Sequence, residues 1–399
     1  MYINAKAIQY AGICKLCFYL ESAQTSLDVC LYILSNRDLA DSMIIAQKNG
    51  AKVRLLIDHT MAQSEPYRLQ ELVNRGVIVQ PAQTRFMLHH KFAVVDNKLV
   101  ITGSFNWTAQ ATLGNFDNAV ISSNSALVTP YTAEFQRLWN LFSLPKDSDN
   151  EKELKERLQK YPFLRQAAWD DIIVGHKAPD FKMLNKLRTL FVRYFYGDPS
   201  PSPATEEDDA NNTANAINEV LFFPDEGIVC NGFLLNDNAE CKFGPKCKYL
   251  HRPTSLSKMG GYLESAETSI DICMYIFTSR KLTEAILRVI KERQCRVRIL
   301  IEASMILKEP DRAKELYNEG VILHATKISI KDLGFMHHKF AIVDNKLVMA
   351  GSFNWTRQAS MGNYDNVIVS NSAQLVTPFV KEFDRLWTTL SEPFVFKQN

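Results

Sequence analysis

The sequence has no long apolar run, almost no net charge and few cysteines, and each absence excludes a class of protein. No uninterrupted apolar stretch reaches the roughly 18 residues of a membrane-spanning helix, and no secretory signal opens the chain. With 46 basic and 44 acidic residues, the net charge of +2 does not by itself indicate a nucleic-acid binder. Eight cysteines among 399 residues exclude a disulfide-stapled scaffold. They favour a reducing compartment. In such a compartment, clustered cysteines are interpreted first as metal ligands rather than as disulfides.

A long internal repeat dominates the rest of the sequence. Residues 89–108 read HHKFAVVDNKLVITGSFNWT and residues 337–356 read HHKFAIVDNKLVMAGSFNWT, so that only three of twenty positions differ. The similarity continues outwards, for example in LESAQTSLDVCLYIL at 20–34 and LESAETSIDICMYIF at 263–277. The chain is therefore two copies of one domain, because unrelated segments do not converge at this level of identity.

Alternating apolar patterns within each copy predict an α/β fold. In the first copy, strands are expected at 28–34, 53–57, 76–79, 92–95, 99–101 and 118–122, and helices at 38–47 and 126–141. We expect two layered domains, each a mixed β-sheet flanked by helices. The expected boundaries are 1–145 for the first repeat, 146–218 for a linker and 219–399 for the second repeat.

The segment between the repeats has no counterpart within them. Residues 151–159 predict a charged helix. Residues 182–195 interleave basic and apolar side chains, which is typical of a helix that packs on a neighbouring domain or lies on a membrane surface. Residues 198–213, DPSPSPATEEDDANNT, have the composition of a disordered linker.

One chemical motif occurs in both copies. Its positions are His89, Lys91, Asp96, Gly103, Ser104 and Asn106 in the first copy and His337, Lys339, Asp344, Gly351, Ser352 and Asn354 in the second. Alternate residues of a strand share a face, so the histidine and lysine project together, as do the serine and asparagine. The lysine supplies charge to a tetrahedral oxyanion, the serine and asparagine supply hydrogen bonds, and the histidine can attack phosphorus or move a proton. The motif predicts phosphoryl-transfer chemistry.

The pattern HxKx4Dx6GSxN resembles that of the phospholipase D superfamily, and HHKFAIVDNKLV…GSFNWT is similar to its mitochondrial cardiolipin hydrolase, or Zucchini-like, branch. The resemblance covers residues 20–142 and 219–392. It implies that two motifs meet across a dimer or pseudo-dimer, and that one histidine becomes a phosphohistidine. The other histidine protonates the leaving oxygen and then activates water, and no metal takes part in catalysis. Single-motif members form homodimers.

This chain departs from the single-motif members because it carries both motifs. It could assemble the active site within one chain as an intramolecular pseudo-dimer, and a homodimer is the alternative. The sequence is also compatible with a joined product of two neighbouring paralogous genes.

The resemblance also implies a carboxylate that orients each catalytic histidine. Asp117 and Asp365 each lie 28 residues after a motif histidine, at His89 and His337, and match that position. A carboxylate bonded to one ring nitrogen fixes the tautomer and supports the imidazolium. The alternative is a strand-end aspartate that bonds nearby backbone.

Four further polar residues of the repeated segment are expected to be structural. Asp96 and Asp344 precede a tight turn, where aspartate commonly stabilises the turn itself. His90 and His338 point away from the faces of their motif neighbours, and we interpret them as packed or hydrogen-bonded histidines.

A cysteine cluster precedes the second copy. Cys230, Cys241, Cys247 and His251 supply three thiols and one imidazole within 22 residues, a complete tetrahedral set for Zn²⁺. The spacing resembles CCCH zinc fingers, and LFFPDEGIVC is similar to the finger of Zucchini-family proteins. The surrounding CKFGPKCKYLHR is basic and aromatic, which favours RNA contact, although one finger can simply brace a domain. The first copy lacks such a finger, and Zn²⁺ is expected to be structural.

Three functions compete on this sequence. The first expectation is a metal-independent endonuclease for single-stranded RNA of the kind used in piRNA biogenesis, favoured by the finger. The alternative is a phospholipase D that hydrolyses cardiolipin to phosphatidic acid, favoured by the amphipathic segment. The third is a catalytically silent RNA- or membrane-binding scaffold, which two intact motifs disfavour. The resemblance implies the mitochondrial outer surface, with a cytoplasmic location as the alternative.

Overall fold

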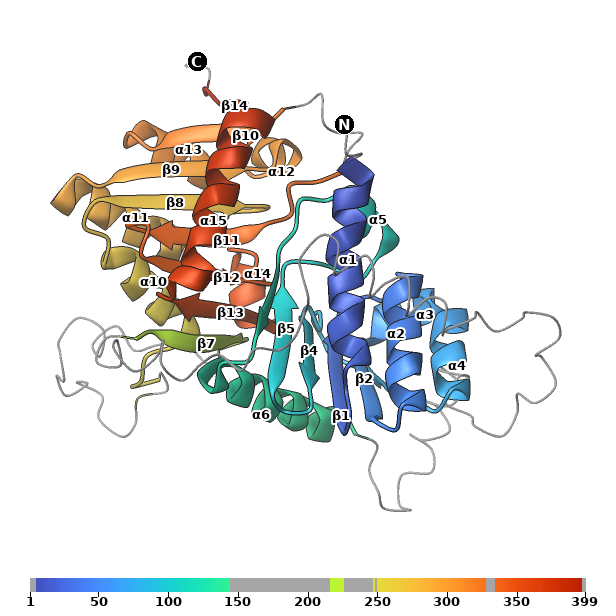
Figure 1. Ribbon diagram of the computed structural model, residues 1–399. Helices are drawn as coiled ribbons and strands as arrows, with labels where there is room; N and C mark the ends of the chain where they lie inside the picture. The colour runs from blue at the N-terminus through green and yellow to red at the C-terminus, as the bar shows by residue number, and fades with distance from the viewer. Residues whose placement is uncertain (1–4, 144–215, 226–246, 248–249, 328–333, 397–399) are drawn as a thin grey trace. The chain divides into compact units, whose positions relative to one another are not determined.

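The computed structural model describes residues 5–143, 216–225, 247, 250–327 and 334–396. The chain divides into two units, of which the first holds the first repeat. The second holds the second repeat together with the short segment Asn115–Asn118. Figure 1 colours the first repeat blue to green and the second yellow to red.

The first unit is a six-stranded mixed sheet. Its strands are β1 (Ser26–Leu31), β2 (Lys52–Asp58), β3 (Ile78–Ala82), β4 (Lys91–Val95), β5 (Leu99–Gly103) and β6 (Ala119–Ser122), in the order β3-β2-β1-β4-β5-β6. β1, β2 and β3 run parallel, and β4, β5 and β6 continue the sheet antiparallel. Its helices are α1 (Ala5–Glu21), α2 (Arg37–Lys48), α3 (His59–Ser64), α4 (Pro66–Asn74), α5 (Ala109–Leu113) and α6 (Ser125–Phe142).

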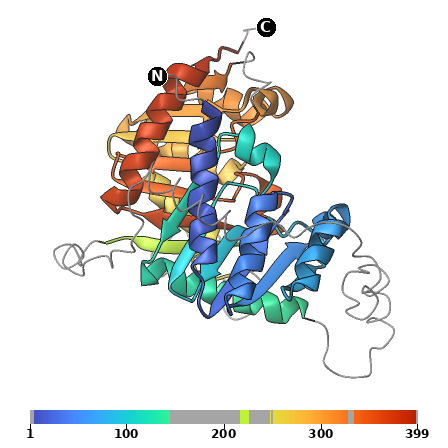
Figure 2. The same ribbon diagram turned by 45° about the vertical axis from the view of Figure 1, so that its right-hand side comes forward.

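Helices cover both faces of this sheet because its strands are apolar on both sides. Val29, Leu55 and Ala93 belong to one buried cluster with residues of α1 and α2, which lie side by side in the turned view of Figure 2. The alternate residues face α6, where the Phe92 ring lies 4.9 Å from that of Tyr131. The central strands are therefore covered on both faces, which explains their continuous rather than alternating hydrophobic runs.

The second unit repeats this sheet and extends it at both edges. The strands are β7 (Asn218–Phe223), β8 (Ser269–Met274), β9 (Arg296–Ile301), β10 (Ile322–Thr326), β11 (Lys339–Val343), β12 (Leu347–Gly351), β13 (Asp365–Ser370) and β14 (Ser391–Pro393), in the order β14-β10-β9-β8-β11-β12-β13-β7. The helices are α10 (Ser255–Glu264), α11 (Arg280–Arg293), α12 (Ala303–Lys308), α13 (Asp311–Asn318), α14 (Arg357–Met361) and α15 (Ala373–Arg385), and a π-helical turn follows at Leu386–Leu390. α15 packs on β8, β11 and β12.

The predicted fold class is confirmed for both repeats, each a mixed sheet flanked by helices. The strands stand within a few residues of their expected places; the run expected at 76–79 forms the strand Ile78–Ala82. The edge strands β7 and β14 were not expected. The linker predictions at 151–159, 182–195 and 198–213 lie outside the described residues. Within the described residues, no helix combines the length and apolarity needed to cross a bilayer.

Candidate active site

In the second unit, a carboxylate orients the motif histidine. His337 lies just before β11 and is buried, with 8% of its surface exposed. Its Nδ1–H donates to Asp117 Oδ1 at 2.8 Å. The backbone fixes the same geometry, because His337 N donates to Phe116 O at 2.9 Å and Phe116 N donates to Phe335 O at 2.8 Å. With the proton held on Nδ1, the lone pair of the neutral ring sits on Nε2.

The origin of this carboxylate differs from the sequence expectation. Counting within each copy assigned Asp117 to His89, yet Asp117 bonds His337, 220 residues away. The segment Asn115–Asn118 separates α5 from β6 in the chain but belongs to the second unit. The motif of the second repeat is therefore completed by a residue from the sequence of the first.

The motif lysine is buried beside this histidine. Lys339 is 2% exposed, and its Nζ donates to the backbone oxygen of His337 at 2.6 Å. Burial lowers the pKa of Lys339 to about 8, because a desolvated ammonium is disfavoured, although the negative charges of Asp117 and Asp365 oppose the shift. The Lys339 ammonium is thus positioned to bind an anion. Because its pKa lies near neutral pH, a small shift in that pKa changes the protonated fraction of the lysine.

The motif serine has a different contact from the one expected. Ser352 is fully buried; its Oγ donates to Asp365 Oδ1 at 2.6 Å and accepts from Asn366 N at 3.1 Å. This hydroxyl therefore holds Asp365 rather than presenting its proton to a ligand. Gly351 precedes it where a Cβ atom would lie 2.1 Å from the backbone oxygen of Asn366, so that only glycine fits.

The motif asparagines carry buried amide oxygens without a hydrogen-bond partner among the described residues. These atoms are Asn106 Oδ1 and Asn354 Oδ1. Buried polar atoms are usually paired, and such exceptions gather at sites that receive a polar ligand. The two amides are accordingly suited to a phosphoryl group or to the water around it.

The first unit repeats the lysine geometry. His89 is 6% exposed and Lys91 is 2% exposed, and Lys91 Nζ donates to the backbone oxygen of His89 at 2.6 Å. Ser104 is fully buried, like its counterpart in the second unit. Each motif therefore places a buried ammonium against the carbonyl of its own histidine.

A second buried carboxylate fixes the backbone just before each histidine, and it lies outside the repeated motif. Glu302 accepts from Met336 N at 2.9 Å, one residue before His337. Asp58 accepts from Leu88 N at 2.9 Å, one residue before His89. The available signal was an acidic residue directly after matching strands, in KVRLLID and RVRILIE.

Two tyrosines were also missed. The ring of Tyr275 lies 5.0 Å from that of His337, and the ring of Tyr32 lies 5.3 Å from that of His89. Tyr32 follows β1 in CLYIL, and Tyr275 follows the matching strand β8 in CMYIF. Their identity between the copies was visible, but a tyrosine at the end of an apolar strand looks like part of the core.

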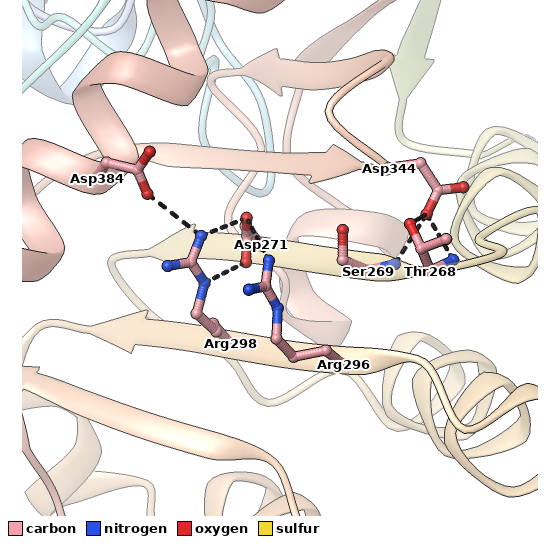
Figure 3. A network of polar contacts seen from close by, with 7 residues as sticks. All are labelled: Thr268, Ser269, Asp271, Arg296, Arg298, Asp344 and Asp384. Carbon is pink, nitrogen blue, oxygen red and sulfur yellow. Dashed lines mark hydrogen bonds and ion pairs between the residues drawn. The ribbon is translucent and has the colours of Figure 1, made fainter.

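The motif aspartates bind backbone, not the site. Asp344 Oδ1 accepts from Thr268 N, Thr268 Oγ1 and Ser269 N at 2.7–2.8 Å, as Figure 3 shows. Asp96 makes the same set of contacts with residues 24–26. Burial alone would raise the pKa of either carboxyl, but these hydrogen bonds outweigh it and lower the pKa. Both carboxylates anchor the entry of a central strand.

The neighbouring histidines, expected to be packed or hydrogen-bonded, are both buried, and the ring of His338 is hydrogen-bonded. Asn118 Nδ2 donates to His338 Nδ1 at 3.1 Å, and His338 Nε2 lies 3.4 Å from Glu382 Oε1. Burial alone would raise the pKa of Glu382, but hydrogen bonds from Arg385 and His338 lower it to about 2. In the first unit, His90 Nε2 lies 3.9 Å from Glu134. These histidines tie α15 and α6 to the motif strands.

The structure leaves the zinc ligands largely undescribed. Cys230 and Cys241 lie outside the described residues, whereas Cys247 is partly buried and His251 is exposed. Among the described residues, no group of three or more histidine, cysteine or acidic side chains is arranged to hold a metal ion. The Cys3His site remains a prediction from the sequence.

Sequence comparison now adds the family. The model of the family described as "Cardiolipin synthase, PLD-like domain" matches residues 16–139 and 261–387. The chain belongs to this family, once in each repeat, and thus to the phospholipase D superfamily of phosphodiesterases. The predicted enzyme class is confirmed.

Relatives with curated names carry a more particular description. A Chlamydomonas reinhardtii protein named "Mitochondrial cardiolipin hydrolase" is 35% identical over 178 residues, which cover 45% of this chain and 76% of the relative. The human protein of that name is 33% identical over 173 residues, covering 42% of this chain and 66% of its own length.

A solved structure shares the fold across both repeats. Phosphatidylserine synthase from Haemophilus influenzae matches with a TM-score of 0.58 at 13% identity, and the match covers 96% of this chain and 85% of the other. At this identity the likeness shows the fold only.

Proposed function

We propose that the chain hydrolyses a phosphodiester through a covalent phosphohistidine. The observation that carries this proposal is the buried imidazole of His337, bonded through Nδ1 to Asp117 and set beside the ammonium of Lys339. One of His89 and His337 attacks phosphorus with Nε2, a nitrogen–phosphorus bond forms, and the bond from phosphorus to the leaving alcohol oxygen breaks.

The second histidine moves the protons of both steps. It gives its proton to the leaving alcohol oxygen. It then takes a proton from water as the water oxygen attacks phosphorus, which breaks the nitrogen–phosphorus bond and releases a phosphomonoester. Lys91 and Lys339 neutralise the phosphoryl oxygens, the amides of Asn106 and Asn354 hold them, and Asp117 and Asp365 position the histidines and stabilise positive charge. Ser104 and Ser352 support this arrangement structurally rather than by binding the phosphoryl group.

We propose further that both motifs serve one reaction as an intramolecular pseudo-dimer. Two facts support this. The reaction needs one nucleophilic and one acidic histidine, and each repeat carries one. The histidine of the second repeat also takes its carboxylate, Asp117, from the sequence of the first.

The proposed substrate is an anionic phospholipid of the cardiolipin type, which would be cleaved to phosphatidic acid. Relatives at 33–35% identity are named for cardiolipin hydrolysis. An exposed aromatic side chain close to the site agrees with a lipid, since Phe335 is 40% exposed two residues before His337. The names of the same relatives support mitochondrial association, and we propose the outer surface as its place; organelle fractionation of the tagged chain tests the association.

The test offers purified full-length chain two substrates, vesicles of phosphatidylcholine with cardiolipin and a labelled single-stranded RNA. We expect phosphatidic acid by mass spectrometry, absent with the matched variant His337→Asn. If the RNA were cleaved and the lipid were not, the substrate would instead be single-stranded RNA, as for the piRNA-type endonuclease that the finger sequence favours. If neither substrate nor bis(p-nitrophenyl) phosphate were cleaved, the scaffold hypothesis would stand.

We propose a structural zinc ion on Cys230, Cys241, Cys247 and His251, because three thiolates and one imidazole form a complete tetrahedral set. The chain would then contain one zinc per molecule, lost in Cys241→Ser. Zinc content by elemental analysis tests the site. Single-turnover cleavage after brief chelation tests its role, and we expect that rate to be unchanged, because the ammonium and imidazole groups already supply the chemistry. A collapse of that rate in folded, zinc-free protein would make the metal catalytic.

A further inference from the structure

The ring of Tyr275 contacts both reactive groups of the second motif. Tyr275 directly follows β8, and its backbone N donates to His338 O at 3.0 Å, so the residue is held in the sheet. Its ring centroid lies 5.0 Å from that of His337 at an interplanar angle of 64°. Lys339 Nζ lies over the same ring, 5.3 Å from its centroid.

The first motif has the same arrangement. Tyr32 follows β1, and its backbone N donates to His90 O at 2.8 Å. The ring of Tyr32 lies 5.3 Å from that of His89, again at 64°, and Lys91 Nζ lies over it at 5.6 Å. The contact therefore recurs in both copies of the motif.

We propose that Tyr275 and Tyr32 are positioning residues whose ring faces keep the adjacent lysine ammonium charged and in place. A cation within about 6 Å of a ring face is attracted by the ring quadrupole, and the attraction is largest where water is excluded. The ring contact with the histidine also leaves the imidazole fewer orientations. The inference rests on the proposed function in one respect, namely that the lysines bind a phosphoryl group.

The other charges around Lys339 make this contribution decisive. Burial lowers the pKa of Lys339 to about 8, and the negative charges of Asp117 and Asp365 oppose that shift, whereas burial raises the pKa of the nearby Cys273 thiol and keeps it neutral. β12 carries no titratable residue, and the half-buried acidic group of α15, Glu382, faces His338. The ring face and the backbone oxygen of His337 are thus the uncharged contacts that favour the ammonium, and a small change in either alters the protonation of Lys339 at neutral pH.

The phenol itself stays neutral in this role. Burial and the negative charge of Glu302 raise the pKa of Tyr275, and burial and Asp58 raise that of Tyr32. A neutral ring keeps its quadrupole, and the interaction belongs to the aromatic face. Phenylalanine should therefore replace either tyrosine, whereas leucine should not.

The experiment titrates Lys339 in the full chain without substrate, by ¹³C NMR of lysines labelled at Cε, with Lys339→Arg to assign the signal. In Tyr275→Leu we expect the pKa of Lys339 to fall by about half to one and a half pH units. In Tyr275→Phe it should stay at the wild-type value. The alkaline limb of bis(p-nitrophenyl) phosphate hydrolysis should move by the same amount. Tyr67→Leu, at a tyrosine that is 90% exposed, is the matched control.

An unchanged or raised pKa in Tyr275→Leu would overturn the proposal, since the ring would then act only as a wall against water. If Tyr275→Leu fails to fold, Tyr32→Leu with Lys91 as the reporter makes the same test. The NMR titration needs no turnover. A shifted lysine in a protein without phosphodiesterase activity would therefore reject the proposed function and leave this inference in place.

Discussion

The contact between Asp117 and His337 is the residue pair on which the proposed chemistry depends. A carboxylate at Nδ1 fixes the tautomer that puts the reactive lone pair on Nε2. Asp117→Asn keeps the shape but loses the charge and presents either an amide oxygen or an amide nitrogen. We expect kcat to fall by about 10²- to 10⁴-fold with little change in the melting temperature.

The matched control for this variant is Asp311→Asn, at an exposed aspartate in the first turn of α13. Steady-state kinetics on bis(p-nitrophenyl) phosphate, with a thermal melt of each protein, makes the comparison. A wild-type kcat in Asp117→Asn would remove the carboxylate from the mechanism.

The buried ammonium of Lys339 is expected to support activity but to lower stability. Its pKa is about 8 in the folded state, below the usual value of 10.5, so folding disfavours the charged form. Below pH 8 this ammonium lowers the free energy of unfolding, and the loss is recovered as pH rises from 8 towards 10.5. We expect Lys339→Met to abolish activity yet to raise the free energy of unfolding at pH 7 by roughly 1–3 kcal/mol.

Urea unfolding of the two proteins at pH 7 and at pH 10 measures this effect. The difference should shrink at pH 10, where the wild-type lysine is mostly neutral. Destabilisation of Lys339→Met at pH 7 would show that the bond from Lys339 Nζ to His337 O outweighs the cost of burying the charge.

At the scale of elements, an arginine connects the central strands to the last helix in each repeat. Figure 3 shows Arg298 of β9 paired with Asp271 of β8 at 2.7 Å and with Asp384 of α15 at 3.3 Å. Its guanidinium also lies over the rings of Phe383 and Trp387. Arg54 makes the corresponding pair with Asp28. The arginine therefore holds the helix against the sheet face that carries His338 and Phe340, which is opposite to the face of His337 and Lys339.

Removal of Arg298 should be costly because Asp271 is 3% exposed and would keep only the longer contact, 4.0 Å, with Arg296. We expect Arg298→Met to lower the free energy of unfolding by about 3–5 kcal/mol, and the double variant Arg298→Met with Asp271→Leu to recover much of this loss. Arg280→Met, in an exposed pair with Glu284, should cost less than about 1 kcal/mol. Equal losses in the single and double variants would show that the ring contacts, not the ion pair, stabilise the helix.

The sequence predicts helices and strands where the pattern of apolar residues is local. It does not predict contacts between residues that are far apart in the chain. Buried runs such as 53–57 predicted strands because both faces of the sheet are covered. β14 was missed, since three residues that pair with β10 leave no periodic signal. The partner of Asp117 was missed for a related reason, because a spacing of 28 residues is the same whichever histidine the carboxylate meets. Ser352 was assigned to the ligand, since a motif does not show that a neighbouring aspartate accepts the hydrogen bond of its hydroxyl.

At the scale of the whole molecule, the proposal of one shared reaction predicts how variants combine. His89→Ala and His337→Ala should each abolish turnover, because nucleophile and acid are both required. If the two motifs of one chain act together, a mixture of the two inactive proteins should remain inactive. Phosphodiesterase assays on each protein and on an equimolar mixture test this, with size-exclusion chromatography to report the oligomeric state.

Recovery of about a quarter to a half of the activity in the mixture would assign the reaction to motifs on different molecules, as in a homodimer. Residual activity near one half in either single variant would instead indicate two independent sites. Both outcomes would reject the intramolecular pseudo-dimer.

The placement of Asn115–Asn118 with the second unit constrains how such a chain can change in evolution. A descendant reduced to the second repeat would keep every strand from β7 to β14, yet its histidine would have lost Asp117. Another molecule would have to donate the missing carboxylate, so the shortened protein would become an enzyme only on self-association. For the same reason the first copy cannot diverge freely while both are joined, because a substitution of Asp117 acts on the histidine of the second.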